Sequence, residues 1–135
     1  MKKLLLALVL GCALALVPTA AASPTVRLAI LHVVHGCHVW GTQDSKPFGP
    51  TRTLVLKPGT KLEIRINCPM AYDVVQVAGP KVLEPSRWQT GTSHTLTFKR
   101  RGVYRLRAVN VQSSEEMNLQ TLGPDNALVL TVRVR

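Results

Sequence analysis

Apolar and polar residues alternate with a period of two along most of the chain, and this pattern constrains the fold more than any other feature. Alternation rich in β-branched residues turns one side of each segment toward a core and the other toward solvent, as in a β-strand. No segment shows sustained helical periodicity. The alternating segments are residues 26–30, 53–56, 62–66, 74–77, 96–98, 103–107 and 128–134. Because turn residues separate these short segments, we expect an all-β fold, a β-sandwich of about seven strands.

The first residues have the layout of a cleavable secretory signal. Lys2 and Lys3 precede an apolar run over residues 4–17, and a stretch of small residues follows. A positive start, a short apolar region and a small-residue cleavage site are the three parts of a signal peptide. We expect cleavage after Ala22. Lipidation at Cys12 is the alternative, because Val-Leu-Gly-Cys loosely resembles the motif of bacterial lipoproteins.

Cleavage of residues 1–22 would leave residues 23–135 as a single domain. A chain of that length supports one hydrophobic core but not two. The signal also predicts a periplasmic or secreted protein, in a compartment where thiols are readily oxidised.

A Cys37-His38 pair follows His35 and Gly36, where the first alternating segment ends. Thiolate and imidazole together favour transition metals, and a strand end is a rigid place from which to present them. In an extended strand the two side chains would face opposite sides, so both can bind one ion only if Gly36 lets the backbone bend. The pair points to copper.

Several short motifs recur between the predicted strands. They are Gly-Cys-His-Val-Trp at residues 36–40, Leu-Lys-Pro-Gly at 56–59, Ile-Asn at 66–67, Ala-Gly-Pro-Lys at 78–81, and the segment 98–104 with its Gly-Val-Tyr. In this order they resemble the cupredoxin family, the small secreted proteins with the blue-copper fold. The resemblance covers essentially all of residues 23–135 and implies a Greek-key β-sandwich.

The resemblance also implies a metal site, because three loops of the cupredoxin fold gather around copper at one end of the sandwich. The corresponding segments here are residues 35–40, 67–73 and 112–118. Their sulfur and imidazole donors are Cys37, His38, Met70 and Met117. One thiolate, one imidazole and thioethers would favour Cu(I). The resemblance therefore implies one copper ion held by these four residues.

The ligand pattern departs from that of blue-copper sites, which use two His, one Cys and a weak axial Met. Residues 111–117, before the last predicted strand, contain neither Cys nor His. Tyr72 occupies the position that normally supplies a His after the third strand of the family. His94 begins another predicted strand, and we expect it as the spare candidate for the missing imidazole.

A disulfide between Cys37 and Cys68 remains open as an alternative to the metal site. Residues 23–135 contain two cysteines, and two cysteines in an oxidising compartment favour a disulfide bridge, whereas the neighbouring His and Met residues favour the metal. With a bridge, the protein would be a metal-free module that binds an envelope or protein partner through a basic face. Zinc is less favoured than copper, because no second paired motif completes a four-ligand site. His32 is in phase with the apolar residues of its segment, which predicts an interior histidine rather than a ligand.

The excess of basic residues predicts the kind of partner. The chain carries 17 Lys and Arg against 7 Asp and Glu, a formal net charge of +10. The arginines on the polar phase of predicted strands are Arg65, Arg105, Arg107, Arg133 and Arg135. Such a face predicts attraction to an acidic redox partner, a copper acceptor protein or an anionic membrane surface, weakening as salt rises. Few aromatic residues and no recognition motif argue against nucleic acid.

The sequence contains no nucleophile motif, no evident carboxylate pair and no phosphate-binding loop, so we do not expect an enzyme. We expect a monomer that binds copper, either to hold and deliver the ion or to transfer one electron. The missing second imidazole favours copper delivery, whereas ligation by His94 would make electron transfer equally favoured.

Overall fold

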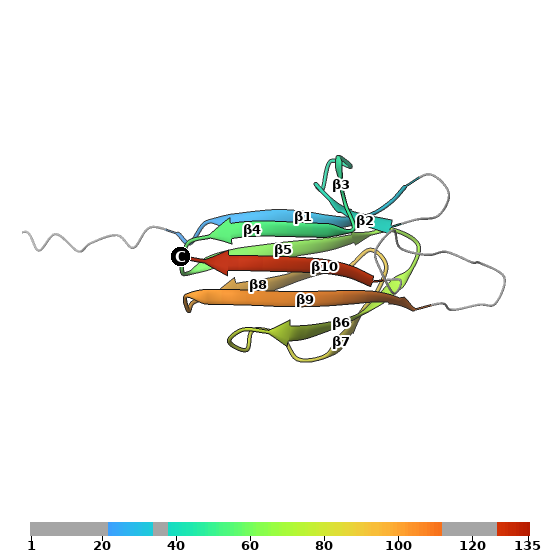
Figure 1. Cartoon of the computed structure of the whole chain (residues 1–135). Coiled ribbons are helices and arrows are strands. Elements are labelled where there is room, and N and C mark those ends of the chain that lie inside the picture. The colour runs from blue at the N-terminus through green and yellow to red at the C-terminus, as the bar shows by residue number, and fades with distance from the viewer. Residues whose placement is uncertain (1–21, 34–37, 112–126) are drawn as a thin grey trace, which may run out of the picture.

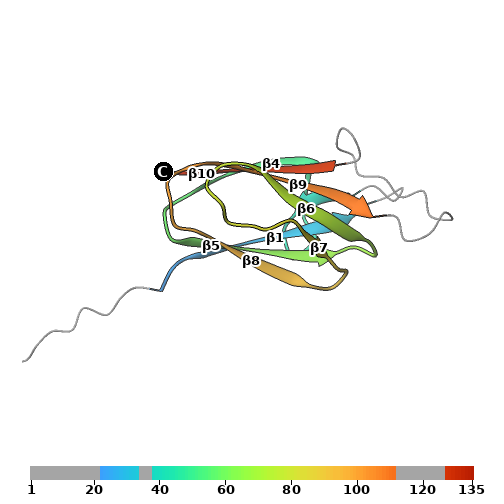
Figure 2. The same cartoon turned by 90° about the horizontal axis from the view of Figure 1, so that it is seen from below.

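The computed structural model describes residues 22–33, 38–111 and 127–135, and these residues form ten β-strands in two five-stranded sheets. The sheets pack face to face as the two layers of a sandwich (Figures 1 and 2). The strands are β1 (Thr25–His32), β2 (His38–Gly41), β3 (Pro47–Gly49), β4 (Thr51–Leu56), β5 (Thr60–Asn67), β6 (Ala71–Ala78), β7 (Ser86–Trp88), β8 (Ser93–Phe98), β9 (Gly102–Val111) and β10 (Ala127–Val134). The all-β sandwich predicted from the alternation is confirmed. In the part of the chain so described, no helix is long and apolar enough to cross a membrane.

Both sheets are mixed. The first has the order β3-β2-β1-β5-β8 and the second the order β4-β10-β9-β6-β7. β1 runs parallel to β5, and β10 runs parallel to β4, whereas the other neighbouring strands are antiparallel. Strands that are distant in the sequence therefore pair directly, and these long-range pairings bring the candidate site together.

β5 shows how the alternation produces the sandwich. Leu62, Ile64 and Ile66 are completely buried, whereas Lys61 before them and Arg65 between the last two are exposed. Successive side chains of a strand point to opposite faces of its sheet, so one face of β5 joins the core and the other meets water.

The structure has ten strands rather than the expected seven or so, because three short strands were not predicted. These are β2, β3 and β7, with four, three and three residues. Their sequences, His-Val-Trp-Gly, Pro-Phe-Gly and Ser-Arg-Trp, lack the alternation with β-branched residues that predicted the other strands. Their pairing with longer neighbours makes them strands: β2 with β1, β3 with β2, and β7 with β6.

The core between the sheets is rich in large aromatic side chains. Trp40, Trp88, Tyr72, Tyr104 and Phe98 are all fully buried. Trp40 of the first sheet donates a hydrogen bond from Nε1 to the carbonyl oxygen of Val129 in the second, at 3.0 Å. This bond ties the two layers together and satisfies the indole N–H inside the core.

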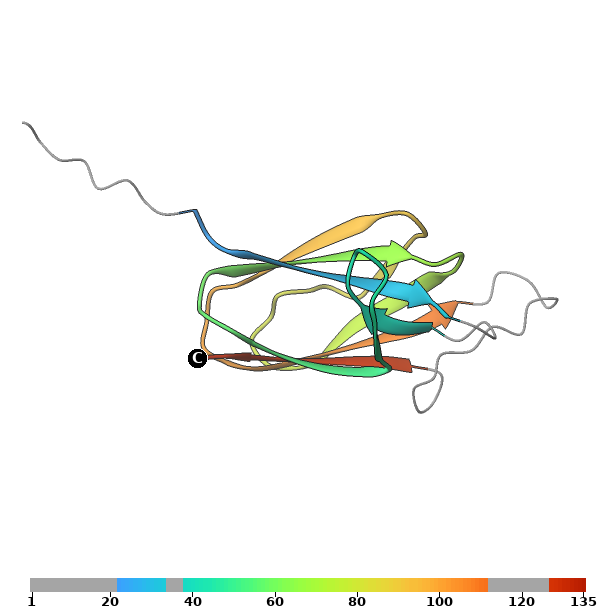
Figure 3. The ribbon, with the colours of Figure 1, turned by 90° about the horizontal axis from the view of Figure 1, so that it is seen from above.

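One end of the sandwich contains the described parts of the segments that the resemblance assigned to a metal site. His32 pairs with His38, Leu31 with Asn67, and Ala71 with Val111. β1, β5 and β9 therefore end where β2, β6 and β10 begin, as Figure 3 shows. We call this the His38 end. The opposite end contains the start of β1 and the end of β10.

Candidate metal centre

His38 is a fully buried histidine at the first position of β2. It lies on the inward phase of β2, which it shares with Trp40 of the core. His32, the last residue of β1, is its partner across the strand pair, and His32 Nδ1 lies 3.2 Å from His38 Nε2. The two rings are tilted, with centroids 5.3 Å apart. The hairpin register therefore brings two imidazole nitrogens into direct contact.

Tyr72 connects this histidine pair to the second sheet. Its ring meets His38 edge on, with centroids 5.7 Å apart. Tyr72 is fully buried, and its hydroxyl interacts with the Cys68 thiol. His38 Nδ1 has no hydrogen-bond partner in the part of the chain that the structure describes, although buried polar groups normally have one.

Burial controls the protonation of His38. Loss of water around the ring, together with the nearby His32, lowers the pKa of His38 to about 4. The imidazole is therefore neutral at ordinary pH, which is the form that binds metal ions. Burial also raises the pKa of Tyr72 above its usual range, and the Cys68 thiol adds to this shift. The phenol stays protonated.

Two sulfur atoms come from the short segment between β5 and β6. Met70 is buried, and Asn110 Nδ2 lies 3.9 Å from its Sδ. Cys68 is buried and carries a free thiol, whose Sγ is 3.6 Å from the carbonyl oxygen of Met70. Burial raises the pKa of this thiol, although its hydrogen bonds oppose the shift. The disulfide between Cys68 and Cys37, which the sequence left open, is not formed in this structure.

His94 has other contacts. Its ring stacks on Trp88 of β7, with centroids 4.4 Å apart and planes within 6° of each other. Its Nε2 lies 2.8 Å from Thr92 Oγ1, and partial burial lowers its pKa. Across residues 22–33, 38–111 and 127–135, no group of three or more His, Cys, Asp and Glu side chains could hold a metal ion. The described donors at the His38 end are thus an imidazole pair with nearby sulfur.

Two of the expected ligands, Cys37 and Met117, lie outside the described residues, as do Cys12 and nearly all of the expected signal peptide. The described residues that border the missing segments are at the His38 end. His38 follows the first segment, and Val111 and Ala127 enclose the second. Both undescribed internal segments are therefore bordered by residues that lie at the His38 end.

His32 is the residue that sequence reasoning missed. Its phase predicted an interior histidine, but it is exposed at the end of β1, with one nitrogen facing His38. The signal in the sequence was that one histidine precedes and another follows the same loop. An antiparallel hairpin can place two such residues opposite one another. The sequence did not show that residues 38–41 form a strand, and this is why the pairing was not recognised.

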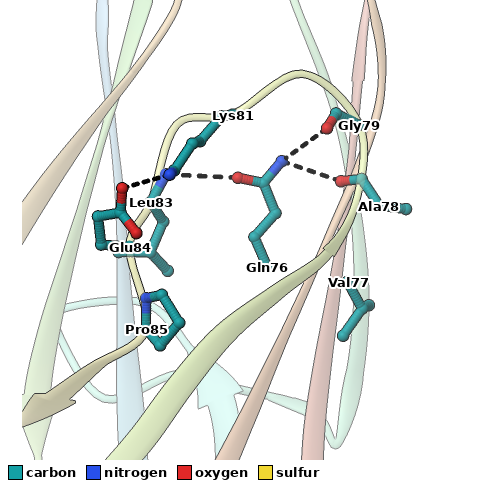
Figure 4. Close-up of a pocket in the computed structure, with 8 residues that line it drawn as sticks. All are labelled: Gln76, Val77, Ala78, Gly79, Lys81, Leu83, Glu84 and Pro85. Carbon is teal, nitrogen blue, oxygen red and sulfur yellow. Dashed lines mark hydrogen bonds and ion pairs between the residues drawn. The ribbon is translucent and has the colours of Figure 1, made fainter.

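A pocket of about 350 Å³ lies at the other end of β6, away from Tyr72. Figure 4 shows the side chain of Gln76 in its wall. The Gln76 amide donates to the carbonyls of Ala78, Gly79 and Pro80 and accepts from the N–H groups of Val82 and Leu83. The amide is fully used in shaping the segment that follows β6, so this pocket is a structural feature of that loop.

No family model and no curated protein matches this sequence. Solved structures match its fold. A purple cupredoxin from Nitrosopumilus maritimus has 13% identity and a TM-score of 0.50, covering 81% of this chain and 98% of that chain. A multicopper oxidase has 13% identity and a TM-score of 0.51, covering 82% of this chain. This chain spans only 41% of the oxidase.

The strand order and these neighbours agree with the motif order in the sequence. At such low sequence identity the similarity concerns the backbone fold and says nothing about which residues bind a metal. The chain therefore has the cupredoxin fold.

Proposed function

We propose that this protein is exported and binds one copper ion at the His38 end. The proposal depends on the 3.2 Å separation between His32 Nδ1 and His38 Nε2. Metal–nitrogen bonds of about 2.0–2.1 Å place two tetrahedral ligands roughly 3.3 Å apart. A hydrogen bond between two neutral imidazoles has a similar length, so metal affinity is the quantity that distinguishes the two cases.

The chemistry of the described donors fits copper. His38 is neutral, and among the described residues one of its ring nitrogens has no partner while the other faces His32. Met70 adds a buried thioether near the same end. Imidazole and thioether donors suit copper better than they suit hard cations such as Mg²⁺ or Ca²⁺. We propose Cys37 and Met117 as the donors that complete the site.

In this proposal His32 supplies the second imidazole for which His94 was the spare candidate. His94 is already stacked on Trp88 and bonded to Thr92, which favours a structural role. Two imidazoles with sulfur donors suit a site that must tolerate both Cu(I) and Cu(II). We therefore favour one-electron transfer over copper delivery, with the protein acting by binding and not as an enzyme.

The decisive experiment measures Cu(I) affinity by competition with a coloured chelator such as bicinchoninate. His32→Ala and His38→Gln should each weaken Cu(I) binding by at least about tenfold, since each removes one nitrogen ligand. His94→Gln is the matched control and should leave the affinity unchanged. Circular dichroism of each variant checks that the sandwich is intact.

Cu(II) addition then separates the two roles. An intense thiolate-to-copper absorption band that disappears in Cys37→Ser would support electron transfer. A colourless protein that retains Cu(I) would support delivery. Unchanged Cu(I) affinity in both His32→Ala and His38→Gln would rule out the histidine pair as the site.

A further inference from the structure

Three arginines share the outer face of the second sheet. Arg105 and Arg107 are two residues apart on β9, where Tyr104 and Leu106 point into the core. Arg133 lies on β10 directly opposite Val103, and so is a diagonal neighbour of Arg105. Diagonal neighbours across an antiparallel pair are about 7–8 Å apart, within reach of long side chains. The three guanidinium groups therefore form one cluster.

Apolar side chains extend this cluster. Arg133 of β10 lies in register between Val55 of β4 and Val103 of β9. Val55 is 52% exposed and Val103 is 45% exposed, so both are among the few large apolar residues that the described surface shows to solvent. We call these five residues, Val55, Val103, Arg105, Arg107 and Arg133, the arginine face.

The described residues around the arginine face do not compensate its charge. In the described parts of the chain, none of its three arginines forms an ion pair. Asp73 of β6 is the nearby acidic group, opposite Val109 of β9. Both of its carboxylate oxygens are already engaged by Arg87, at 2.8 and 3.1 Å. The arginine face thus has several guanidinium donors available for an external anion.

We propose that the arginine face docks a carboxylate-rich patch on a folded protein partner. Arginine binds carboxylates with two parallel hydrogen bonds, and it is enriched at protein interfaces from which lysine is depleted. The face contains arginine but no lysine. Its strands β9 and β10 are each paired on both sides, so the backbone that carries the donors is already ordered before binding.

The same residues argue against a membrane as the occupant. Interfacial segments of peripheral proteins bury Trp, Phe or Leu side chains in the lipid and keep lysine and arginine on their polar side. The apolar members of the arginine face are two valines, whose short side chains lie flat on a sheet. A flat array of arginine and valine is better matched by another protein surface.

The test uses the purified protein, labelled with ¹⁵N, and a polyglutamate peptide as the carboxylate probe. Titration at about 20 mM salt should shift the Nε–H resonances of the three arginines, and binding should weaken at about 150 mM salt. The triple variant Arg105→Gln, Arg107→Gln and Arg133→Gln should bind the peptide roughly tenfold more weakly, the loss expected for three exposed ion pairs.

The matched control removes three exposed charges from the outer face of the first sheet, as Arg27→Gln, Lys61→Gln and Arg65→Gln. This variant has the same net charge as the first and should retain peptide binding. A ¹⁵N spectrum of each variant checks its fold. A further triple variant that changes the same three arginines to Lys keeps the charge and should still weaken binding, because bidentate pairing is lost.

Several outcomes would overturn the proposal. They are equal loss in the two Gln variants, loss only in the control, full binding by the Lys variant, and absence of peptide binding at low salt. Binding to phosphatidylglycerol vesicles that depends on the arginine face, without binding to the peptide, would identify a membrane surface instead. These results are independent of copper affinity, so they do not bear on the histidine pair.

Discussion

His38 combines burial, neutrality and a ring nitrogen that no described residue bonds, and few structural roles require all three. A histidine kept only for packing would normally pair both nitrogens or be replaced by an apolar residue, because an unpaired buried polar group costs roughly 1–3 kcal/mol. The fold accepts this cost at the first residue of a strand, beside a second imidazole. A cost borne at one residue in a well-packed core is typical of a functional position.

The burial of His38 predicts a specific pH dependence for the metal-free protein. The folded pKa of about 4 lies below the usual value of 6.5, so the unfolded chain takes up the proton first. Stability should be fully present above about pH 6.5 and should fall as the pH drops toward 4, by at most about 3 kcal/mol. Urea unfolding in the presence of a chelator measures this loss.

His38→Gln should flatten that pH profile. Some slope will remain, because burial also lowers the pKa of His94. If the unfolding curves of the variant and the parent protein stay parallel between pH 6.5 and 4, His38 is not the group whose protonation opposes folding.

At the scale of elements, the segment between β5 and β6 controls the state of Cys68. The thiol is buried, and burial raises its pKa, so it should be almost unreactive in the folded protein. In Cys37→Ser, a thiol reagent should find no rapidly reacting group under native conditions and one group from Cys68 after unfolding. The Cys12→Ser change is included so that no other thiol is counted.

The parent protein provides the contrasting measurement. Unfolded without reductant, it should release both Cys37 and Cys68 as free thiols, because Cys68 is unbridged. Absence of both thiols would restore the disulfide alternative and remove Cys37 from the proposed copper site.

The turn after β6 depends on a single glycine. Gly79 has a φ of +93°, and an added Cβ would lie 2.6 Å from the carbonyl oxygen of Val103. Gly79→Ala should therefore destabilise the protein by about 1–3 kcal/mol through strain and close contact. Gly91 is the matched control, with a φ of +77° and no atom within 4 Å of an added Cβ. Chemical denaturation of both variants should show a clearly larger loss for Gly79→Ala.

At the scale of the whole molecule, the two proposed surfaces are separate. The histidine pair lies between the layers at one end, whereas the arginine face lies on the outside of the second sheet. A partner docked on the arginine face would leave the His38 end accessible. Long-range charge attraction to that partner would weaken with salt, but the copper affinity of a largely buried site would change little.

Export is also a property of the whole chain. Expressed with its own N-terminus in a bacterial host with a periplasm, the protein should be recovered from the periplasm beginning at Ser23. The small residues before that position form the expected cleavage site. Intact mass and N-terminal sequencing check this. A membrane-bound product with a lipid mass on Cys12, lost in Cys12→Ser, would show the lipoprotein instead.

The alternation of apolar and polar residues was enough to predict a β-sandwich and the residues of each long strand that face the core. A period of two encodes the inward side of a strand directly, as β5 shows with Leu62, Ile64 and Ile66. The short strands β2, β3 and β7 could not be foreseen, because their three or four residues lack the alternation with β-branched residues and become strands by pairing with longer neighbours. Only the tertiary structure decided which strands pair. The parallel pairing of β1 with β5, and the register that sets His32 against His38, come from contacts between distant segments. Those contacts made His32 a candidate ligand and stacked His94 on Trp88, which no local pattern in the sequence could reveal.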